Sequence, residues 1–285
     1  MKGYIKNIIR VAKAVRCRNK IILANLSWPS VKGCVNLNWW KQNGEVQNVG
    51  DWLSLIVVDH MKAQHNIHTD TAAKGTKHLY AIGSIIDGGY QDATIWGSGL
   101  HRGRRRYWWR HLRKLDIRCV RGPETRSILM DHGYACPEIY GDPAILMPLI
   151  YQPERVEKVY DYRVVPHMIF GTGYPNALSP ATNDWRAFID EIVRSKLVIS
   201  SSLHGIILAE AYGIPAILLH NNNLSLFKYK DYYSSTGRYT FPIAQSVEEA
   251  LSMTPAEIPD FTNMQKNLID VFPVDLWAEK TEKRN

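Results

Sequence analysis

The sequence predicts an α/β fold with parallel sheets, and residues 197–219 (LVISSSLHGIILAEAYGIPAILL) give the clearest reason. A short apolar run at 197–199, typical of a buried parallel strand, precedes three serines and a helical pattern that stops at Gly213. A second apolar run follows at 216–219. The same alternation of short strands, polar turns and helices recurs in both halves of the chain, which indicates parallel sheets covered by helices.

Length and composition predict two domains after a short basic segment. The 285 residues have room for two domains of roughly 130 residues each. We expect an N-terminal segment at 1–20, a first domain at 21–150 and a second domain at 160–285 that ends in helices. The residues between the two domains are rich in charges and tyrosines, as interdomain linkers often are.

Several classes of protein are disfavoured by the composition. Hydrophobic residues make up 45% of the chain and charged residues 22%, the proportions of an ordinary globular protein. No apolar run approaches the ~20 residues of a membrane span, and there is no signal-peptide pattern. The cysteines (Cys17, Cys34, Cys119 and Cys136) show neither a CxxC pair nor zinc-finger spacing. We therefore expect free thiols in a reducing cytoplasm and no dedicated metal site.

Two basic segments raise the question of partners, because the net charge is +8. As a helix, residues 1–20 would be basic and amphipathic, which suits either an anionic bilayer or the protein's own surface. Residues 101–118 interleave arginines with Tyr107, Trp108 and Trp109, a composition found at nucleic-acid sites and at lipid headgroups. No nucleic-acid-binding motif accompanies them, so peripheral membrane contact or a polyanionic glycan is favoured.

The first half is expected to contain strands at 21–24, 78–82, 93–96 and 117–120, and a helix that Asp51 opens as N-cap or first-turn acid. Two of these strands run into a Gly-Ser pair, which predicts a ligand or backbone close to the sheet edge. Neither pair belongs to a GxGxxG motif, so no dinucleotide fingerprint is present. Arg121 follows the last strand, where it could bind a carboxylate or phosphate, or form a salt bridge with a nearby acid.

In the second half we expect a strand at 163–167, a mobile loop over the cleft at 171–183 and a helix at 185–194. Two more helices are expected at 246–253 and 263–271.

His204 lies in the first turn of the helix predicted after residue 202. The free backbone N–H groups of such a turn can bind an anion, and an imidazole there can exchange protons near neutral pH. The alternative is structural: serines before a helix are usually caps, and a lone histidine is more often part of the packing.

Six ordered motifs between about residues 45 and 225 resemble the polysaccharide pyruvyltransferase family. They are Asn48-x-Gly50-Asp51, the Gly-Ser pairs at 83–84 and 97–98, Arg121-Gly122-Pro123-x-Thr125-Arg126, Tyr140-Gly141-Asp142-Pro143, Pro166-His167, and Ser201-Ser202-Leu203-His204-Gly205 with the helix that follows. Many members carry Arg two residues before the histidine, where this chain has Ser202.

The resemblance implies two Rossmann-like domains facing across a cleft, a GT-B-like arrangement with the acceptor on the N-terminal side and the donor on the C-terminal side. It also implies transfer of a pyruvyl group from phosphoenolpyruvate to a pair of sugar hydroxyls, which forms a ketal and releases phosphate. The acceptor would be a cell-surface polysaccharide such as an exopolysaccharide or capsule, or its lipid-linked precursor. Phosphoenolpyruvate is the donor substrate, and no cofactor or metal is expected.

His204 is the expected general acid and base. The residues expected to bind the donor are Arg121, Arg126, Ser201, Ser202, Leu203 and Gly205, and those expected to line the cleft or bind the acceptor are Asn48, Gly50, Asp51, Gly83, Ser84, Gly97, Ser98 and His167. A nucleotide-sugar glycosyltransferase on the same architecture stays open as an alternative. A nucleic-acid-binding protein is the third hypothesis, and it would leave the turn at His204 without a role. We expect a cytoplasmic protein, at the inner face of the membrane if the basic segments bind lipid.

Overall fold

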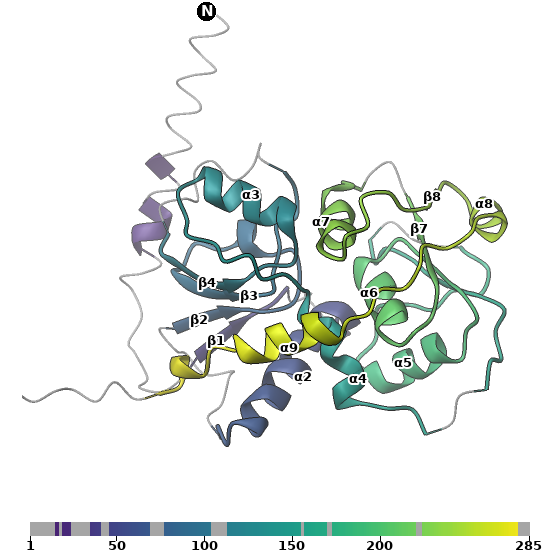
Figure 1. Ribbon diagram of the computed structural model, residues 1–285, viewed down its shortest axis with the longest axis horizontal. Helices are drawn as coiled ribbons and strands as arrows, with labels where there is room; N and C mark the ends of the chain where they lie inside the picture. The colour runs from purple at the N-terminus through teal and green to yellow at the C-terminus, as the bar shows by residue number, and fades with distance from the viewer. Residues whose placement is uncertain are drawn as a thin grey trace, which may run out of the picture.

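Two parallel four-stranded sheets form the framework of the computed structural model (Figure 1). The structure describes residues 15–16, 19–23, 35–40, 46–68, 77–103, 113–154, 157–169, 173–220 and 224–278. The first sheet contains β1 (Val35–Asn38), β2 (Lys77–Tyr80), β3 (Ala93–Trp96) and β4 (Leu115–Cys119), and the second contains β5 (Arg163–Val165), β6 (Val198–Ser200), β7 (Ala216–Leu219) and β8 (Ile243–Ala244). The predicted α/β class is therefore confirmed.

Strand order follows chain order in both sheets, and every neighbouring pair is parallel. Within the described residues neither sheet has the reversal of strand order that creates a switch point in a doubly wound sheet. The central strands are apolar because helices cover both of their faces. All residues of β3, β6 and β7 are buried.

The helices of the first half lie on two sides of its sheet (Figure 1). α3 (Pro123–Asp131) packs its buried Ile128 and Leu129 with the side chains of Ile95 and Ile117. α2 (Val49–Gln64) lies on the other side. Shorter elements are η1 (Ile86–Gly88), η3 (Pro143–Leu146) and α4 (Met147–Ile150).

The second half contains α5 (Trp185–Val193), α6 (Leu203–Ala211), α7 (Phe227–Ser235) and α8 (Val247–Ser252). The strand–turn–helix–strand unit predicted at 197–219 is present as β6, α6 and β7. The helices expected at 185–194 and 246–253 are also present, whereas α7 was not predicted. Its sequence, FKYKDYYSS, has no clear apolar stripe that would indicate a helix.

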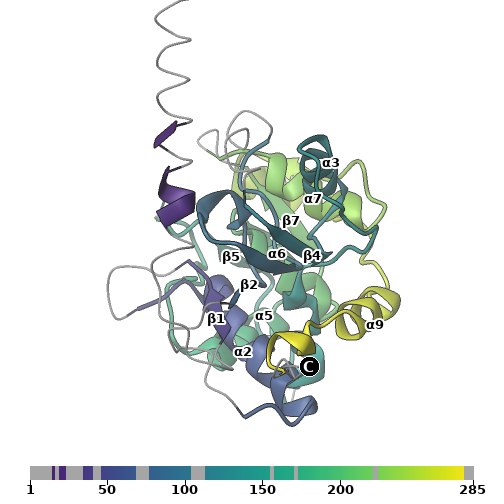
Figure 2. The same ribbon diagram turned by 90° about the vertical axis from the view of Figure 1, so that its left-hand side faces the viewer.

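The two halves share one hydrophobic core. A single cluster joins Leu37 and Leu79 of the first sheet to Val165 and Val198 of the second through buried side chains of α2, α5 and α6. The chain then returns to the first half: α9 (Thr262–Asp270) and η4 (Val274–Leu276) follow the second sheet, yet α9 lies on the same side of the first sheet as α2 (Figures 1 and 2). The indole N–H of Trp96 donates to the carbonyl of Leu268 (2.9 Å). The predicted second domain, 160–285, thus ends on the first half.

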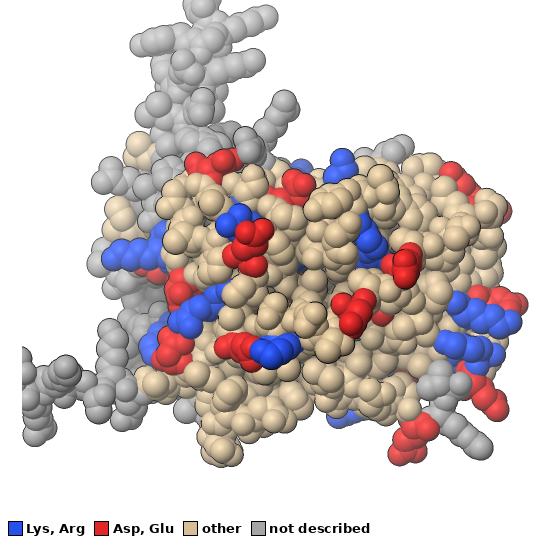
Figure 3. All heavy atoms as spheres, viewed as in Figure 1, with Lys and Arg blue, Asp and Glu red and all other residues tan. Residues whose placement is uncertain are grey.

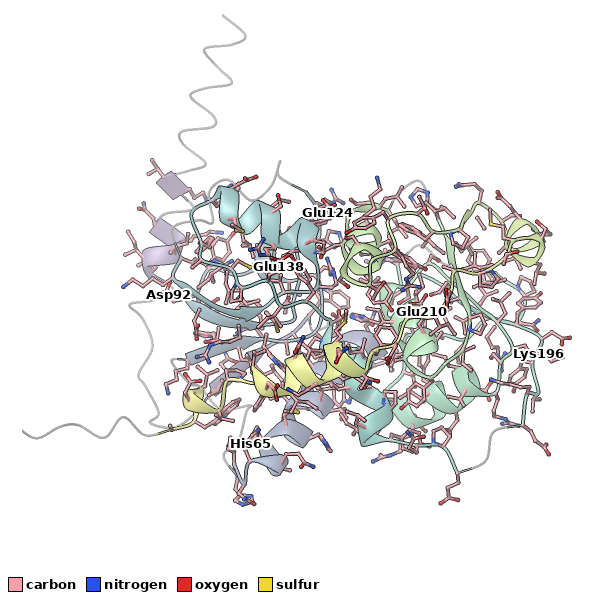
Figure 4. All side chains as sticks on the ribbon, viewed as in Figure 1. His65, Asp92, Glu124, Glu138, Lys196 and Glu210 are labelled. Carbon is pink, nitrogen blue, oxygen red and sulfur yellow. The ribbon has the colours of Figure 1, made fainter. Side chains whose placement is uncertain are left out.

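A buried ionic network fixes α7 to α6. Both carboxylate oxygens of Glu210, labelled in Figure 4, accept hydrogen bonds from the guanidinium of Arg238 at 2.7 and 2.6 Å. The hydroxyl of Tyr232 donates to the same carboxylate at 2.6 Å. This arrangement sets the position of α7, which contributes to the site described below.

Two expectations for local structure were wrong. Residues 21–23 are helical rather than a strand; only Ile21 among them is buried, whereas a central parallel strand needs cover on both faces. The stretch expected as a mobile loop is anchored in its described part, 173–183. Its backbone pairs with Val164 of β5, and its carbonyl at Pro180 accepts from Val49 N at the start of α2. Most of the predicted basic segments, at 1–20 and 101–118, lie outside the described residues.

Candidate active site

A pocket of about 440 Å³ lies between the two halves. Seven predicted site residues line it: Asn48, Asp51, Ser84, His167, Ser202, Leu203 and His204. Further lining residues were not predicted, and the chemically important ones among them are Asp87, His101 and Lys228. The pocket therefore brings together residues that are separated by up to 188 positions in the sequence, from Trp40 to Lys228.

The imidazole of His204 is held between the two halves. It belongs to the first turn of α6 and packs against the backbone of Gly50 in α2: a Cβ built at Gly50 would lie 2.1 Å from its Nδ1. Only a glycine at this position leaves room for the ring. Its Nε2 faces Oδ2 of Asp142 at 3.6 Å.

Asp142 is fully buried and plays two parts. Its Oδ1 accepts a hydrogen bond from Ala144 N (3.1 Å), which caps the short helix η3. Its Oδ2 and the Nε2 of His204 are both buried, and neither has a hydrogen-bond partner within the described residues. A buried carboxylate oxygen without a donor is costly unless a positive charge compensates it. The buried carboxylate of Asp142 therefore faces the imidazole of His204 directly.

The three serines before α6 have different tasks. Ser200 is buried and its hydroxyl donates to Val165 O (3.0 Å), while it accepts from Ser202 N (3.0 Å). Ser201 Oγ accepts from His167 N at 3.2 Å and so holds the backbone that follows the neighbouring strand β5. Ser202 lies at the N-cap of α6 without a side-chain capping bond, and it lines the pocket. Gly205 packs against Ser200 and Val165 rather than into the pocket.

Lys228 gives the pocket a positive field. It is the only Lys or Arg among the described lining residues, it is buried, and it has no ion pair within the described part of the chain. Burial, followed by the charge of Arg121, lowers the pKa of Lys228 to about 8, although the charge of Asp51 partly opposes the shift. Burial, followed by the charge of Lys228, also lowers the pKa of His167 to about 4 and lowers that of His101. Both histidines are therefore neutral near pH 7, while Lys228 is mostly protonated.

Asp51 lies in the first turn of α2, where Asn48 rather than Asp51 is the N-cap. Burial raises the pKa of Asp51 to about 6, although the charges of His204 and Lys228 partly offset the effect. Asp51 is thus a carboxylate that exchanges protons just below neutral pH, inside the same pocket as His204.

Arg121 is buried away from the pocket. Its guanidinium forms an ion pair with Asp231 of α7 (Nη2 to Oδ2, 2.9 Å) and donates to Leu100 O (2.9 Å) and Ser84 Oγ (2.6 Å). Asp231 also accepts from the backbone N and the hydroxyl of Thr125. The sequence allowed either an anion or a nearby acid as the partner of Arg121, and the structure shows the salt bridge, with Asp231. This salt bridge holds α7 against the first half. Arg126 lies in α3, where its Nε donates to Cys136 O (3.0 Å), and it does not line the pocket.

The two Gly-Ser pairs shape the floor of the site. Gly83 and Gly97 have φ values of +110° and +85°, which residues other than glycine rarely adopt. The hydroxyl of Ser98 donates to Gly83 O at 2.8 Å, so the pairs are joined to each other. A Cβ at Gly97 would lie 2.3 Å from Pro143, the residue after Asp142. These glycines thus allow close packing around the catalytic candidates, and of the four residues only Ser84 lines the pocket.

Lys, Arg, Asp and Glu side chains are interspersed on the face shown in Figure 3. Acidic residues outnumber basic ones in the described part of the sequence, so the net positive charge is carried by residues outside it. Within the described ranges, no helix is both long and apolar enough to cross a bilayer. Within the same ranges, no group of three or more His, Cys, Asp or Glu is arranged to hold a metal. Of the cysteines, Cys119 and Cys136 are buried free thiols, and the other two lie outside the described residues.

The chain is similar in sequence to known proteins. Residues 71–223, which include Arg121, Asp142 and His204, match the family described as polysaccharide pyruvyl transferase. The chain is 30% identical over 133 residues to the succinoglycan biosynthesis protein ExoV of Rhizobium meliloti, a match that covers 43% of this chain and 41% of ExoV. It is 28% identical over 177 residues to an uncharacterized protein of Acanthamoeba polyphaga mimivirus, with 56% of this chain and 60% of that protein covered. The chain thus spans about half the length of these relatives.

A solved structure shows the same fold. The uncharacterized protein KP1_0663 of Klebsiella pneumoniae aligns with a TM-score of 0.52 and 17% identity, over 81% of this chain and 98% of that one.

Proposed function

The chain belongs to the polysaccharide pyruvyl transferase family, and we propose that it transfers a pyruvyl group from phosphoenolpyruvate to two hydroxyls of a sugar, forming a ketal and releasing phosphate. One observation carries this proposal: His204 lies in a pocket between the halves with a buried, unpartnered carboxylate oxygen of Asp142 facing its ring. A histidine so placed is suited to donate a proton.

The chemistry requires a proton donor first. The methylene carbon (C3) of phosphoenolpyruvate takes up a proton, which leaves C2 electrophilic. One sugar hydroxyl adds to C2, phosphate departs with the electrons of its C–O bond, and a second hydroxyl closes the ketal ring. In our proposal the imidazolium of His204 supplies the proton to C3. The negative charge of Asp142, 3.6 Å from Nε2, would stabilise that imidazolium, while the ring is held in place by its packing against Gly50.

Donor binding requires positive charge for a phosphate and a carboxylate. Lys228 supplies an unpaired ammonium, and the first turn of α6 supplies backbone N–H groups beside Ser202. A buried ammonium without a counter-ion favours the binding of an anion. We therefore assign the donor's anionic groups to this side of the pocket. Lys228 would provide here the cation that Ser202 does not.

The acceptor would enter from the first half, past Asn48 and Asp51. We extend the proposal to a GT-B-like use of the two halves, each contributing one substrate to the shared pocket. The acceptor class would be a cell-surface polysaccharide or its lipid-linked precursor, which the enzyme would meet at the inner face of the membrane.

The test is release of phosphate from phosphoenolpyruvate in the presence of methyl β-glucoside, methyl β-galactoside and methyl α-mannoside, each of which offers a 4,6-hydroxyl pair. We expect release that depends on an acceptor, and a product whose mass equals that of the glycoside plus a pyruvate ketal. A thermal-shift measurement with phosphoenolpyruvate and with nucleotide-sugars runs in parallel. Stabilisation by a nucleotide-sugar alone would contradict the proposal and favour a glycosyltransferase.

A further inference from the structure

A second acid–base group lies in the pocket besides His204. Asp51 is half-buried on the rim formed by the first half, in the first turn of α2. The residue before it, Gly50, carries the backbone against which the His204 ring packs. Because Gly50 and Asp51 are consecutive in α2, the backbone of Asp51 is held close to the imidazole of His204.

The carboxylate of Asp51 has an unused hydrogen-bonding capacity. Within the described residues it accepts no hydrogen bond and forms no ion pair. Its Oδ1 lies close to Gly83, because a Cβ built there would be 3.1 Å from this oxygen. A carboxylate partly removed from water without donors is unfavourable by itself and is well suited to accept a proton from a ligand.

The charged and titratable groups around Asp51 come from every side of the pocket. They are His204 of α6, Lys228 of α7, Asp142 before η3, and Asp87, His101 and His167 along the lining. Asp142 is fully buried behind the imidazole, so it cannot reach a sugar. Asp87 already accepts from His101 N at 3.2 Å. Asp51 is thus the carboxylate of this set that is best placed to meet an acceptor.

Ketal formation also requires more proton transfers than one histidine can perform at once. Two hydroxyls each lose a proton, one proton is gained by C3, and one is gained by the departing phosphate. A single imidazole would have to carry these protons one after another between C3, the two hydroxyls and the phosphate oxygen, whereas a second acid–base group lets two of the transfers proceed without it.

We infer that Asp51 is a second catalytic residue, one that takes the proton of the first attacking hydroxyl and delivers it to the departing phosphate. The inference rests on the function proposed above. His204 gives its proton to C3, the first hydroxyl oxygen bonds to C2, and its proton goes to the Asp51 carboxylate. The C2–O bond to phosphate then breaks while Asp51 returns that proton to the phosphate oxygen. The second hydroxyl bonds to C2, and its proton goes to the neutral imidazole. Both residues thereby return to their starting protonation states, His204 as the imidazolium and Asp51 as the carboxylate.

Two features support this division of work. Asp51 interacts electrostatically with Lys228, the proposed anchor of the donor's anionic groups. The departing phosphate would therefore lie near Asp51. Its pKa of about 6 also lets it both accept and release a proton near neutral pH.

The experiment compares wild type with Asp51→Asn, and uses Asp184→Asn as a matched control. Asp184 is exposed and caps α5 away from the pocket, and an asparagine can serve equally well as a cap there. Phosphate release and ketal formation are measured with the methyl glycoside that the wild type accepts, from pH 5 to pH 8. Binding of phosphoenolpyruvate is measured separately by calorimetry.

We expect Asp51→Asn to lower kcat by about 10²-fold or more at pH 8, with melting temperature and donor affinity preserved. Because an acid of pKa about 6 is mostly protonated at pH 5, the ratio of wild-type to variant rate should fall about tenfold from pH 8 to pH 5. Taking this ratio cancels the titration of the donor's own phosphate. Formate should partly restore the rate of Asp51→Ala, which a merely structural role would not allow.

The outcomes separate this inference from the proposed function. If wild type turns over and Asp51→Asn keeps its rate, or if the ratio does not change with pH, Asp51 has no catalytic role and the function stands. If wild type binds phosphoenolpyruvate but neither variant nor wild type releases phosphate with any of the three glycosides, both the proposed reaction with these acceptors and the role of Asp51 in it are overturned.

Discussion

His204 Nε2 and Asp142 Oδ2 face each other at 3.6 Å, and they come from opposite halves of the molecule. Asp142 follows β4 in the first half, whereas His204 opens α6 in the second. The pair therefore exists only when the shared core between the halves is formed.

Replacement of His204 by Ala should abolish acceptor-dependent phosphate release, with a loss of about 10³-fold or more, because the proton donor to C3 is removed. The fold should survive, since the ring is partly exposed to the pocket and its neighbours need not rearrange. Circular dichroism and the melting temperature check the fold. Activity close to wild type would remove His204 from the mechanism.

Asp142→Asn separates the two parts that Asp142 plays. The amide oxygen can still accept from Ala144 N, so the cap of η3 is kept, but the negative charge opposite His204 is lost. We expect a fall in kcat of about 10²-fold with little loss of stability. The measurement is steady-state kinetics beside thermal unfolding. A variant that unfolds at the wild-type temperature and keeps full activity would show that the carboxylate does not assist the histidine.

Gly50→Ala tests the position of the imidazole. The new methyl would lie 2.1 Å from His204 Nδ1, so the ring must move, and a shift of about 1 Å at a catalytic group can cost about 10²-fold in rate. Gly103→Ala serves as the control, because Gly103 does not line the pocket and a Cβ there would meet only the Phe227 ring, at 3.4 Å. We expect Gly50→Ala to lose most activity and Gly103→Ala to keep it. Equal activities would mean that the ring position is not critical.

Lys228→Met should weaken donor binding and raise stability at neutral pH. Because the folded-state pKa of Lys228 is about 8, below its ordinary value of 10.5, the folded protein holds the proton less well than the unfolded chain. The cost is present below pH 8 and is relieved as pH rises from 8 to 10.5, and it amounts to roughly 3 kcal/mol. Denaturant unfolding should show a stabilised variant at pH 7 and a smaller difference at pH 10. Calorimetry should show weaker binding of phosphoenolpyruvate; unchanged affinity would contradict the assignment.

Asp231→Ala should destabilise the protein strongly. It leaves the buried guanidinium of Arg121 without its carboxylate, and breaking a buried pair costs about 3–5 kcal/mol. Asp161→Ala breaks the pair with Lys196 instead, which is exposed, and should have no measurable effect. Urea unfolding of both variants is the check. A small effect at Asp231 would mean that α7 is held mainly by its apolar contacts.

The sequence predicted those parts of the molecule that local patterns specify. The apolar run at 197–199, the serines and the helix at His204 follow from short-range preferences, and all were found in place. It could not predict α7, because that helix is stabilised by Tyr232, Glu210 and Arg238 rather than by its own periodicity. Lys228 was missed for the same reason: its role becomes visible only when α7 is placed against the pocket.

The sequence by itself determined the α/β class, the order of the motifs and the identity of His204 as the candidate catalytic residue. Only the tertiary structure decided which groups surround it: Asp142 behind the ring, Gly50 beside it, and Asp51 and Lys228 in the same pocket. It also placed Arg121 in a buried ion pair with Asp231 rather than on the pocket wall. The physical reason is that local conformation depends on neighbouring residues, whereas these contacts join residues more than 60 positions apart and form only when the two halves bury a common core.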